Sequence, residues 1–186
     1  DVNDRKFTIL PGMGSGGSSA LMEASFYGHL DVVQALLAAK ADVDATRSEK
    51  SDGETALTLA VQKNHVEVVG ALLAANADVD HPCCSANALY AAARNTNLDM
   101  VRVLLAAKPD LDRVERISGR TALMVAIDSG RPDVARLLVE AGANVNRMSR
   151  NGFTPLLKVA TQDSPGSLAI VPVLLAAGAD PDFRDC

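Results

Sequence analysis

The chain has 186 residues, of which 48% are hydrophobic, 22% are charged and only 3% are aromatic, with no tryptophan. So many apolar residues can bury a core, which excludes a disordered chain. The scarcity of aromatic side chains favours small, closely packed helices over a β-sandwich or barrel. A formal net charge of -5 argues against a general nucleic-acid binder, because phosphate binding needs a clustered basic surface.

Cysteine usage and apolar runs bear on where the protein resides. The chain has three cysteines, and the neighbours Cys83 and Cys84 cannot form an ordinary bridge with each other. No run approaches the roughly 18 consecutive apolar residues of a membrane helix, and no secretory leader is recognised. We therefore expect a soluble, intracellular and cytoplasmic protein without membrane insertion.

The first segment, residues 1–18, is rich in glycine. Gly12, Gly14 and Gly17 have the spacing G-x-G-x-x-G, which after a strand and before a helix is typical of a dinucleotide site. Such a site needs a βαβ unit, whereas here a second helix is expected to follow the first. The favoured interpretation is a flexible glycine-rich loop, either natural or an engineered linker.

Two phrases recur along the rest of the chain at intervals of 32 to 36 residues, which indicates a repeat architecture. The opening phrase has Ser, Thr or Asn followed by small and apolar residues, and its five copies are Ser19–Ala24, Thr55–Ala60, Asn87–Ala92, Thr121–Ala126 and Thr154–Val159. The closing phrase resembles Ala-Asp-Val-Asp, and its copies end at Asp44, Asp80, Asp112, Asn146 and Asp182.

Each copy predicts two short antiparallel helices. The opening Ser, Thr or Asn is suited to cap a helix N-terminus. After a turn, an acidic residue suits the first turn of a second helix, as at Asp31 and Glu67. The second helix carries an apolar stripe at helical spacing, as in Val69, Leu72 and Leu73. The polar segment between the closing phrase and the next cap is expected to form a projecting, hairpin-like finger.

The ends of the second helices predict a left-handed backbone. Glycine stands there in two copies, at Gly142 and Gly178, whereas Lys40, Asn76 and Lys108 take that place in the others. Lysine adopts a positive φ poorly, so we expect modest strain at Lys40 and Lys108.

The last copy departs from the others because Pro172 falls inside its expected second helix. Proline removes a backbone donor and should kink or redefine that helix.

These phrases resemble the ankyrin-repeat family, most closely at Thr154–Leu156, Gly28–Val33 and Ala143–Asn146. The resemblance covers about residues 19–182 and implies an all-α fold with short hairpin fingers, a solenoid of stacked helix-turn-helix units. We expect one domain over 1–186. Residues 1–18 would hold the end of a preceding repeat and a long finger, and the five repeats would be approximately 19–50, 51–83, 84–116, 117–149 and 150–182.

The two ends of the sequence favour a slice of a longer array. Asp1–Asn3 resembles a closing phrase, and Phe183–Cys186 resembles the start of another finger. Neither end resembles the polar cap that solenoids usually need.

Catalytic and metal-binding patterns are weak. His29 and His65 occupy equivalent turn positions, which favours a structural role over a catalytic pair. His81, Cys83 and Cys84 lack the separated ligand pairs typical of a zinc site. No nucleophile elbow, Walker loop or His-Glu-x-x-His motif is present. We therefore expect no enzyme activity, no catalytic residue, no metal and no cofactor.

The resemblance implies that partners meet the finger tips, the residue before each cap and the pair after each first helix. The pairs are Phe26 and Tyr27, Gln62 and Lys63, Arg94 and Asn95, Asp128 and Ser129, and Thr161 and Gln162. The residues before the caps are Ser18, Glu54, Ala86, Arg120 and Phe153. Aromatic and arginine side chains are common binding anchors. For Phe26, Tyr27 and Phe153, packing between repeats remains the alternative.

Charge is distributed unevenly, because the fingers are net basic while the rest of the chain is acidic. The segments 113–120 and 147–153 each carry +2. We hypothesise a protein partner with an acidic segment that meets Arg113, Arg116, Arg120, Arg147 and Arg150, with an apolar anchor near Met148 and Phe153. The alternative is that these arginines are solvated and only keep the protein soluble.

Two functions fit this sequence. The favoured one is a protein–protein interaction module, and the alternative is a regulatory domain acting in cis within a larger enzyme or channel. No nucleic-acid partner is expected, and the oligomeric state is left open.

Overall fold

The computed structural model describes residues 18–46, 53–81, 87–94, 97–161 and 165–183. Within these ranges the regular secondary structure is entirely helical, as expected. The glycine-rich segment 12–17 and the Cys83–Cys84 pair lie outside them. The chain divides into two compact units, 1–88 and 89–186, which are described separately.

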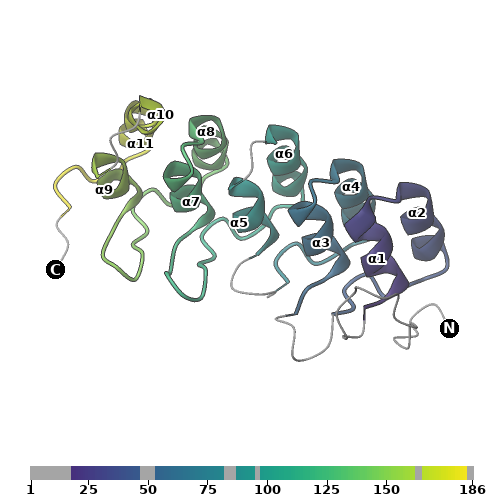
Figure 1. Ribbon diagram of the computed structural model, residues 1–186. Helices are drawn as coiled ribbons and strands as arrows, with labels where there is room; N and C mark the ends of the chain where they lie inside the picture. The colour runs from purple at the N-terminus through teal and green to yellow at the C-terminus, as the bar shows by residue number, and fades with distance from the viewer. Residues whose placement is uncertain (1–17, 47–52, 82–86, 95–96, 162–164, 184–186) are drawn as a thin grey trace. The chain divides into compact units, whose positions relative to one another are not determined.

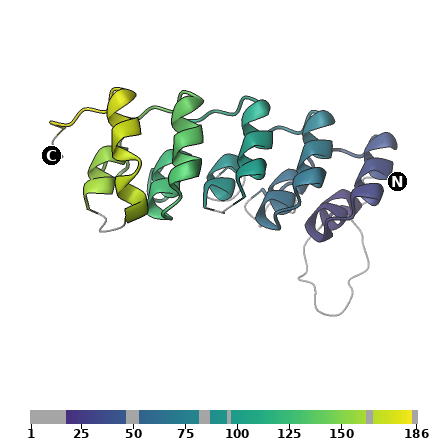
Figure 2. The same cartoon turned by 90° about the horizontal axis from the view of Figure 1, so that it is seen from above.

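The first unit contains two helix pairs. Its helices are α1 (Ala20–Tyr27), α2 (Leu30–Ala38), α3 (Ala56–Gln62) and α4 (Val66–Ala74). The first helices α1 and α3 pack together, as do the second helices α2 and α4 (Figures 1 and 2). Their facing sides bury the core side chains Leu21, Val33, Leu57, Val69 and Leu72. Apolar burial between neighbouring pairs therefore holds this unit together.

The second unit repeats this arrangement. Its helices are α5 (Ala88–Ala93, whose first residue ends the first unit), α6 (Leu98–Ala106), α7 (Ala122–Asp128), α8 (Pro132–Glu140), α9 (Pro155–Ala160), α10 (Pro165–Leu168) and α11 (Val171–Ala176). The helix α7 packs against α9, and α8 lies between α6 and α11 (Figure 2). The segments before α7 and α9 project from the opposite side to α6 and α8 (Figure 1).

The predicted N-caps are confirmed at four helices. The hydroxyl oxygens of Ser19, Thr55, Thr121 and Thr154 each accept the backbone N–H three residues on, at 3.3 to 3.4 Å. Each cap satisfies one N–H that the helix leaves unpaired, which stabilises it by about 1 kcal/mol.

The predicted left-handed helix ends are also confirmed. The φ angle is 60° at Lys40, 63° at Asn76 and 54° at Lys108. The glycines at the same place, Gly142 and Gly178, have φ of 97° and 86°. The three residues that carry a Cβ adopt the conformation of the glycines, because the closing hydrogen bonds of the helix require it.

The closing phrases connect neighbouring repeats. The carboxylate of Asp44 accepts the backbone N–H of Asp78 at 2.9 Å, within the first unit. In the second unit, Asp112 accepts the N–H of Asn144, also at 2.9 Å. Asn146 accepts the N–H of Asp180 at 2.9 Å and donates to the carbonyl of Gly178 at 2.8 Å. At the end of these three phrases, a short acceptor side chain is therefore a joint between repeats.

Pro172 changes where the second helix of the last repeat begins. It lies in the first turn of α11, where a missing N–H is tolerated, and the short helix α10 precedes it in the chain.

Candidate functional site

The finger formed by residues 113–120 closes as a tight hairpin. The backbone N–H of Glu115 donates to the carbonyl of Arg120, and the N–H of Gly119 donates to the carbonyl of Glu115, both at 2.9 Å. Glu115 as a residue is only 7% exposed. Its carboxylate accepts the N–H groups of Ile117 and Ser118, both at 2.6 Å, and the Ser118 hydroxyl. An acidic side chain therefore fixes the finger from inside.

The pKa of Glu115 lies below its ordinary value. Burial acts to raise this pKa, but the hydrogen bonds from Ser118 and Ile117, together with the charge of Arg120, lower it by more. The charged carboxylate is thus the form that the finger stabilises.

Tyr90, on α5, contributes to the same finger and was not predicted. Burial raises the pKa of its hydroxyl, against the opposing effects of Arg120 and of a hydrogen bond with Ser118. Its position in α5 corresponds to Met22 and Met124 in other repeats, where the side chain is buried. The signal in the sequence was a tyrosine, with its polar hydroxyl, at a position where other repeats carry a buried apolar side chain.

The next finger, residues 147–153, lies against the first. The N–H of Ser149 donates to the carbonyl of Phe153 at 2.9 Å, and the Ser149 hydroxyl accepts the N–H of Phe153 at 3.2 Å. The two fingers are joined where the N–H of Arg150 donates to the carbonyl of Ser118 at 3.0 Å. The predicted hairpin-like shape is confirmed for these two fingers, and the bond between them was not predicted.

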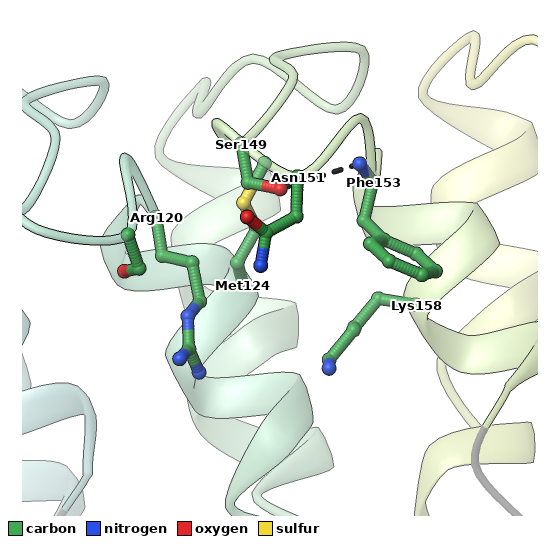
Figure 3. Close-up of a pocket in the computed structure, with 7 residues that line it drawn as sticks. Arg120, Met124, Ser149, Asn151, Phe153 and Lys158 are labelled. Carbon is green, nitrogen blue, oxygen red and sulfur yellow. Dashed lines mark hydrogen bonds between the residues drawn. The ribbon is translucent and has the colours of Figure 1, made fainter. Parts of the chain in front are cut away.

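A small pocket lies between these fingers and the helices α7 and α9. Its cavity of about 70 Å³ is lined by Ser118, Arg120, Met124, Ser149, Asn151, Phe153 and Lys158. Figure 3 shows Arg120 and Lys158 on opposite sides of the pocket, with Asn151 between them. This space accommodates the end of one side chain and is too small for a nucleotide.

The two cations of the pocket share one anion. Arg120 Nη1 lies 2.6 Å from Asp128 Oδ2, and Lys158 Nζ lies 3.1 Å from Asp128 Oδ1. Lys158 Nζ also lies 5.5 Å from the centroid of the Phe153 ring, within range of a cation–π interaction. The sequence predicted Arg120, Asp128 and Phe153 as separate contacts, and the structure brings them together around Lys158.

Lys158 was missed in the sequence, although a signal was present. The equivalent positions carry Leu59, Ala91 and Val125, which are apolar, and Glu23 in the first repeat. The last repeat alone has a basic residue at this position, and that difference was the available signal.

The finger tips combine basic and apolar side chains. Arg116, Arg147 and Arg150 are exposed and Arg113 is half-buried, and none of them forms an ion pair with another residue that the structure describes. Ile117 is 78% exposed and Met148 is 50% exposed. Ile117 was also missed in the sequence, where an apolar residue between Arg116 and Ser118 was the available signal.

The predicted contacts of the first unit form a separate aromatic cluster. The rings of Phe26 and Tyr27 meet edge to face at 5.1 Å, and Tyr27 stacks on His29 at 6.1 Å. Lys63 Nζ lies 4.3 Å from the Phe26 ring centroid, and His65 Nε2 lies 3.1 Å from the Phe26 carbonyl. The contact with the carbonyl oxygen gives His65 a structural role, since this oxygen only accepts.

The other predicted contact residues are placed as follows. Gln62, Arg94 and Thr161 are exposed, and Ser129 is half-buried at the C-terminus of α7. Asn95, Ala86 and Gln162 lie outside the described residues.

The described ranges hold neither a candidate metal cluster nor a membrane-spanning helix. No group of three His, Cys, Asp or Glu side chains could hold a metal ion there. No helix in those ranges combines the length and apolar character needed to span a membrane.

Paired helices joined by bonded fingers define a helical repeat protein. The family description "Ankyrin repeats (3 copies)" matches residues 21–115, 72–149 and 89–185. The chain therefore belongs to the ankyrin-repeat family, whose members are generally protein-binding modules without enzyme activity.

Similar proteins support the assignment to this family. The chain is 34% identical over 172 residues to "Putative ankyrin repeat protein YahD" of Escherichia coli (strain K12), a match covering 91% of this chain and 68% of the relative. It is 36% identical over 96 residues to the mouse nuclear factor NF-kappa-B p105 subunit, covering 51% of this chain and 10% of that protein. A match of 31% over 99 residues to the mouse B-cell lymphoma 3 protein homolog covers 53% of this chain and 21% of that protein.

Proposed function

We propose that this ankyrin-repeat protein binds a partner protein through the bonded fingers 113–120 and 147–153. The partner segment carries acidic residues with an apolar residue among them. Arg113, Arg116, Arg147 and Arg150 attract the acidic residues, and Met148 and Ile117 contact the apolar one.

The observation that carries this proposal is that the arginines at the finger tips form no ion pair with another described residue. Most charged side chains on a stable surface are interspersed with the opposite sign. Here four arginines have no acidic partner among the described residues, and the one acid of the first finger, Glu115, is turned inward to its own backbone. An acidic segment supplies the charge that this surface lacks.

The rigidity of the fingers supports the same function. Both hairpins are closed by backbone hydrogen bonds and joined through Arg150 and Ser118. A surface that is already ordered loses less conformational entropy on binding. Exposed Ile117 and Met148 on ordered backbone are therefore suited to contact a partner.

The proposal is tested by selecting peptides from a randomised display library on the 186-residue protein. We expect the selected peptides to be enriched in Asp and Glu with a nearby apolar residue. Their association rate should fall steeply between low and physiological salt, because exposed charges are screened over about 8 Å at 0.15 M.

The matched variants are two double charge reversals in the second unit. Arg116→Glu/Arg147→Glu changes the finger tips, whereas Arg102→Glu/Arg136→Glu changes exposed arginines on α6 and α8 by the same total charge. Selected peptides should lose at least about tenfold in affinity for the first variant and keep it for the second. Equal binding to both variants, or peptides without acidic residues, would contradict the proposal.

A further inference from the structure

The pocket between the fingers has donors that the fold leaves unused. The hydroxyl of Ser149 accepts the Phe153 N–H, and its own proton has no acceptor among the described residues. The side chain of Asn151 makes no hydrogen bond within that part of the chain. Arg120 uses Nη1 for Asp128, while the remaining N–H groups of its guanidinium have no described acceptor. The lining therefore offers these donors to an acceptor from outside.

The ion-pair cluster of Arg120, Lys158 and Asp128 carries one net positive charge. Arg120 and Lys158 contribute two positive charges, and Asp128 contributes one negative charge. Asp128 contacts both cations but is not among the residues that line the cavity. Glu115 also lies within electrostatic reach of Arg120, but it does not line the cavity and its carboxylate accepts from the backbone of its own finger. One singly charged anion in the cavity would balance the charge of this three-residue cluster.

The shape and the apolar wall restrict what this anion is. The cavity of about 70 Å³ admits a carboxyl group with adjoining methylene groups. Phe153 and Met124 offer the apolar surface on which such methylene groups pack. Figure 3 shows the Phe153 ring on the same side as Lys158.

We propose that this pocket binds one acidic side chain, Glu or Asp, of the partner segment. This inference rests on the proposed function and makes it specific to one position of the segment. The carboxylate lies between Arg120 and Lys158 and accepts from Ser149 and Asn151. Asp128 orients both cations and limits the pocket to a singly charged ligand, so a doubly charged phosphate is disfavoured.

The test uses three small probes in NMR titrations of the 186-residue protein. The probes are the N-acetyl, N-methylamide derivatives of glutamate, glutamine and phosphoserine. The glutamate probe should shift the side-chain amide of Asn151 and the backbone amides of Ser149 and Phe153 saturably. The glutamine probe should bind about tenfold more weakly, because it lacks the charge-assisted hydrogen bonds. The phosphoserine probe should bind no more tightly than the glutamate probe.

Variants separate the pocket from the finger tips. Lys158→Gln should weaken the glutamate probe about tenfold, and Lys158→Arg should retain most of the binding. Arg136→Gln on α8 removes the same charge outside the pocket and should have no effect. Asp128→Asn should raise the affinity for phosphoserine at least as much as that for glutamate, because it removes the charge that disfavours a dianion. Each variant is first compared with the parent by the dispersion of its amide spectrum.

The outcomes also distinguish this inference from the proposed function. Equal binding of glutamate and glutamine, or tighter binding of phosphoserine to the parent protein, overturns the acidic side-chain pocket. A second result would overturn the pocket inference and leave the proposed function standing. In that result, binding of the selected peptides depends on Arg116 and Arg147, but the glutamate probe does not shift the Asn151 amide. If the glutamate probe binds in the pocket but the selected peptides bind equally well to the finger-tip variant, the pocket inference is supported. The proposed function, which needs the finger-tip arginines, is then contradicted.

Discussion

The backbone N–H of Arg150 donates to the carbonyl oxygen of Ser118 at 3.0 Å, and this bond joins the two fingers of the candidate surface. Both residues lie at positions where the chain turns. The Arg150 side chain stays exposed, whereas the Ser118 hydroxyl is bonded to the Glu115 carboxylate. The contact brings the two basic segments together, and Ser118 lines the pocket beside it. The proposed binding surface therefore depends on how closely the fingers approach.

Gly119→Ala should separate the fingers. A Cβ at this position would lie 2.7 Å from Arg150 Cγ and 2.9 Å from Arg150 N, and φ is +68°. We expect a loss of about 2–3 kcal/mol in the free energy of unfolding, from backbone strain and the close contact together. Urea unfolding followed by circular dichroism measures it.

Gly130→Ala is the matched control for this substitution. Its φ is +64°, but a Cβ there would meet nothing within 4 Å. It should therefore show only the conformational cost of about 1–2 kcal/mol. If the two variants lost the same free energy of unfolding, the close contact between the added Cβ and Arg150 would have no destabilising effect of its own.

The stability of the first finger should depend on pH through Glu115. Because the pKa of Glu115 is lowered in the folded protein, its contribution is present above the ordinary pKa of a glutamate. That contribution is lost as the pH falls through the lowered folded value. Acid should therefore loosen the finger, and hydrogen exchange of the Ile117 and Ser118 amides across this pH range measures the effect.

Glu115→Gln provides the comparison for this pH dependence. An amide oxygen is a weaker acceptor than a carboxylate, so the variant should lose about 1–3 kcal/mol at neutral pH. Its Ile117 and Ser118 amides should show no additional opening with acid. A pH dependence that is the same in the variant and the parent would assign the effect to another group.

The repeat phrases predicted the helices because each phrase acts locally. Caps such as Thr121 and left-handed ends such as Lys40 depend on neighbours within one or two turns, so their residue types and spacing are sufficient. The finger positions followed from the same spacing. The relation between the fingers did not, because the bond from Arg150 to Ser118 is made by backbone atoms that any residue carries.

The electrostatics of the site were predicted less completely. The charge count for segment 113–120 included Glu115 as one negative charge of the finger, whereas the structure turns its carboxylate onto the Ile117 and Ser118 amides. Counting also treated Arg120 as available to a partner, although Asp128 already contacts it. Composition gives the sign of the net charge of a surface. The direction in which each charged side chain points depends on backbone donors and on neighbouring repeats.

Replacing a strained lysine with glycine should stabilise the first unit. Lys40 has φ of 60° and closes α2 through bonds to Leu37 and, at the next residue, to Leu36. Gly142 closes α8 with the same pattern. Lys40→Gly should therefore gain about 1 kcal/mol, since the strain it removes exceeds the entropy cost of glycine.

Lys40→Ala serves as the control, because alanine keeps the Cβ and should give no such gain. The midpoint of urea unfolding, observed by circular dichroism, measures both variants. If Lys40→Ala raised the midpoint as much as Lys40→Gly, the gain would come from loss of the lysine side chain and not from relief of backbone strain.

The joint between neighbouring repeats should tolerate asparagine but not alanine. Asp112 Oδ1 accepts the N–H of Asn144 at 2.9 Å, and Asn146 performs the same task for Asp180 at the same distance. Asp112→Ala should therefore cost about 0.5–1.5 kcal/mol and accelerate hydrogen exchange at the Asn144 amide. Asp112→Asn should restore both, because the amide oxygen of asparagine occupies the same place. If Asp112→Asn lost as much as Asp112→Ala, the negative charge would be the stabilising feature, and the joint would act through electrostatics on the backbone of the next repeat.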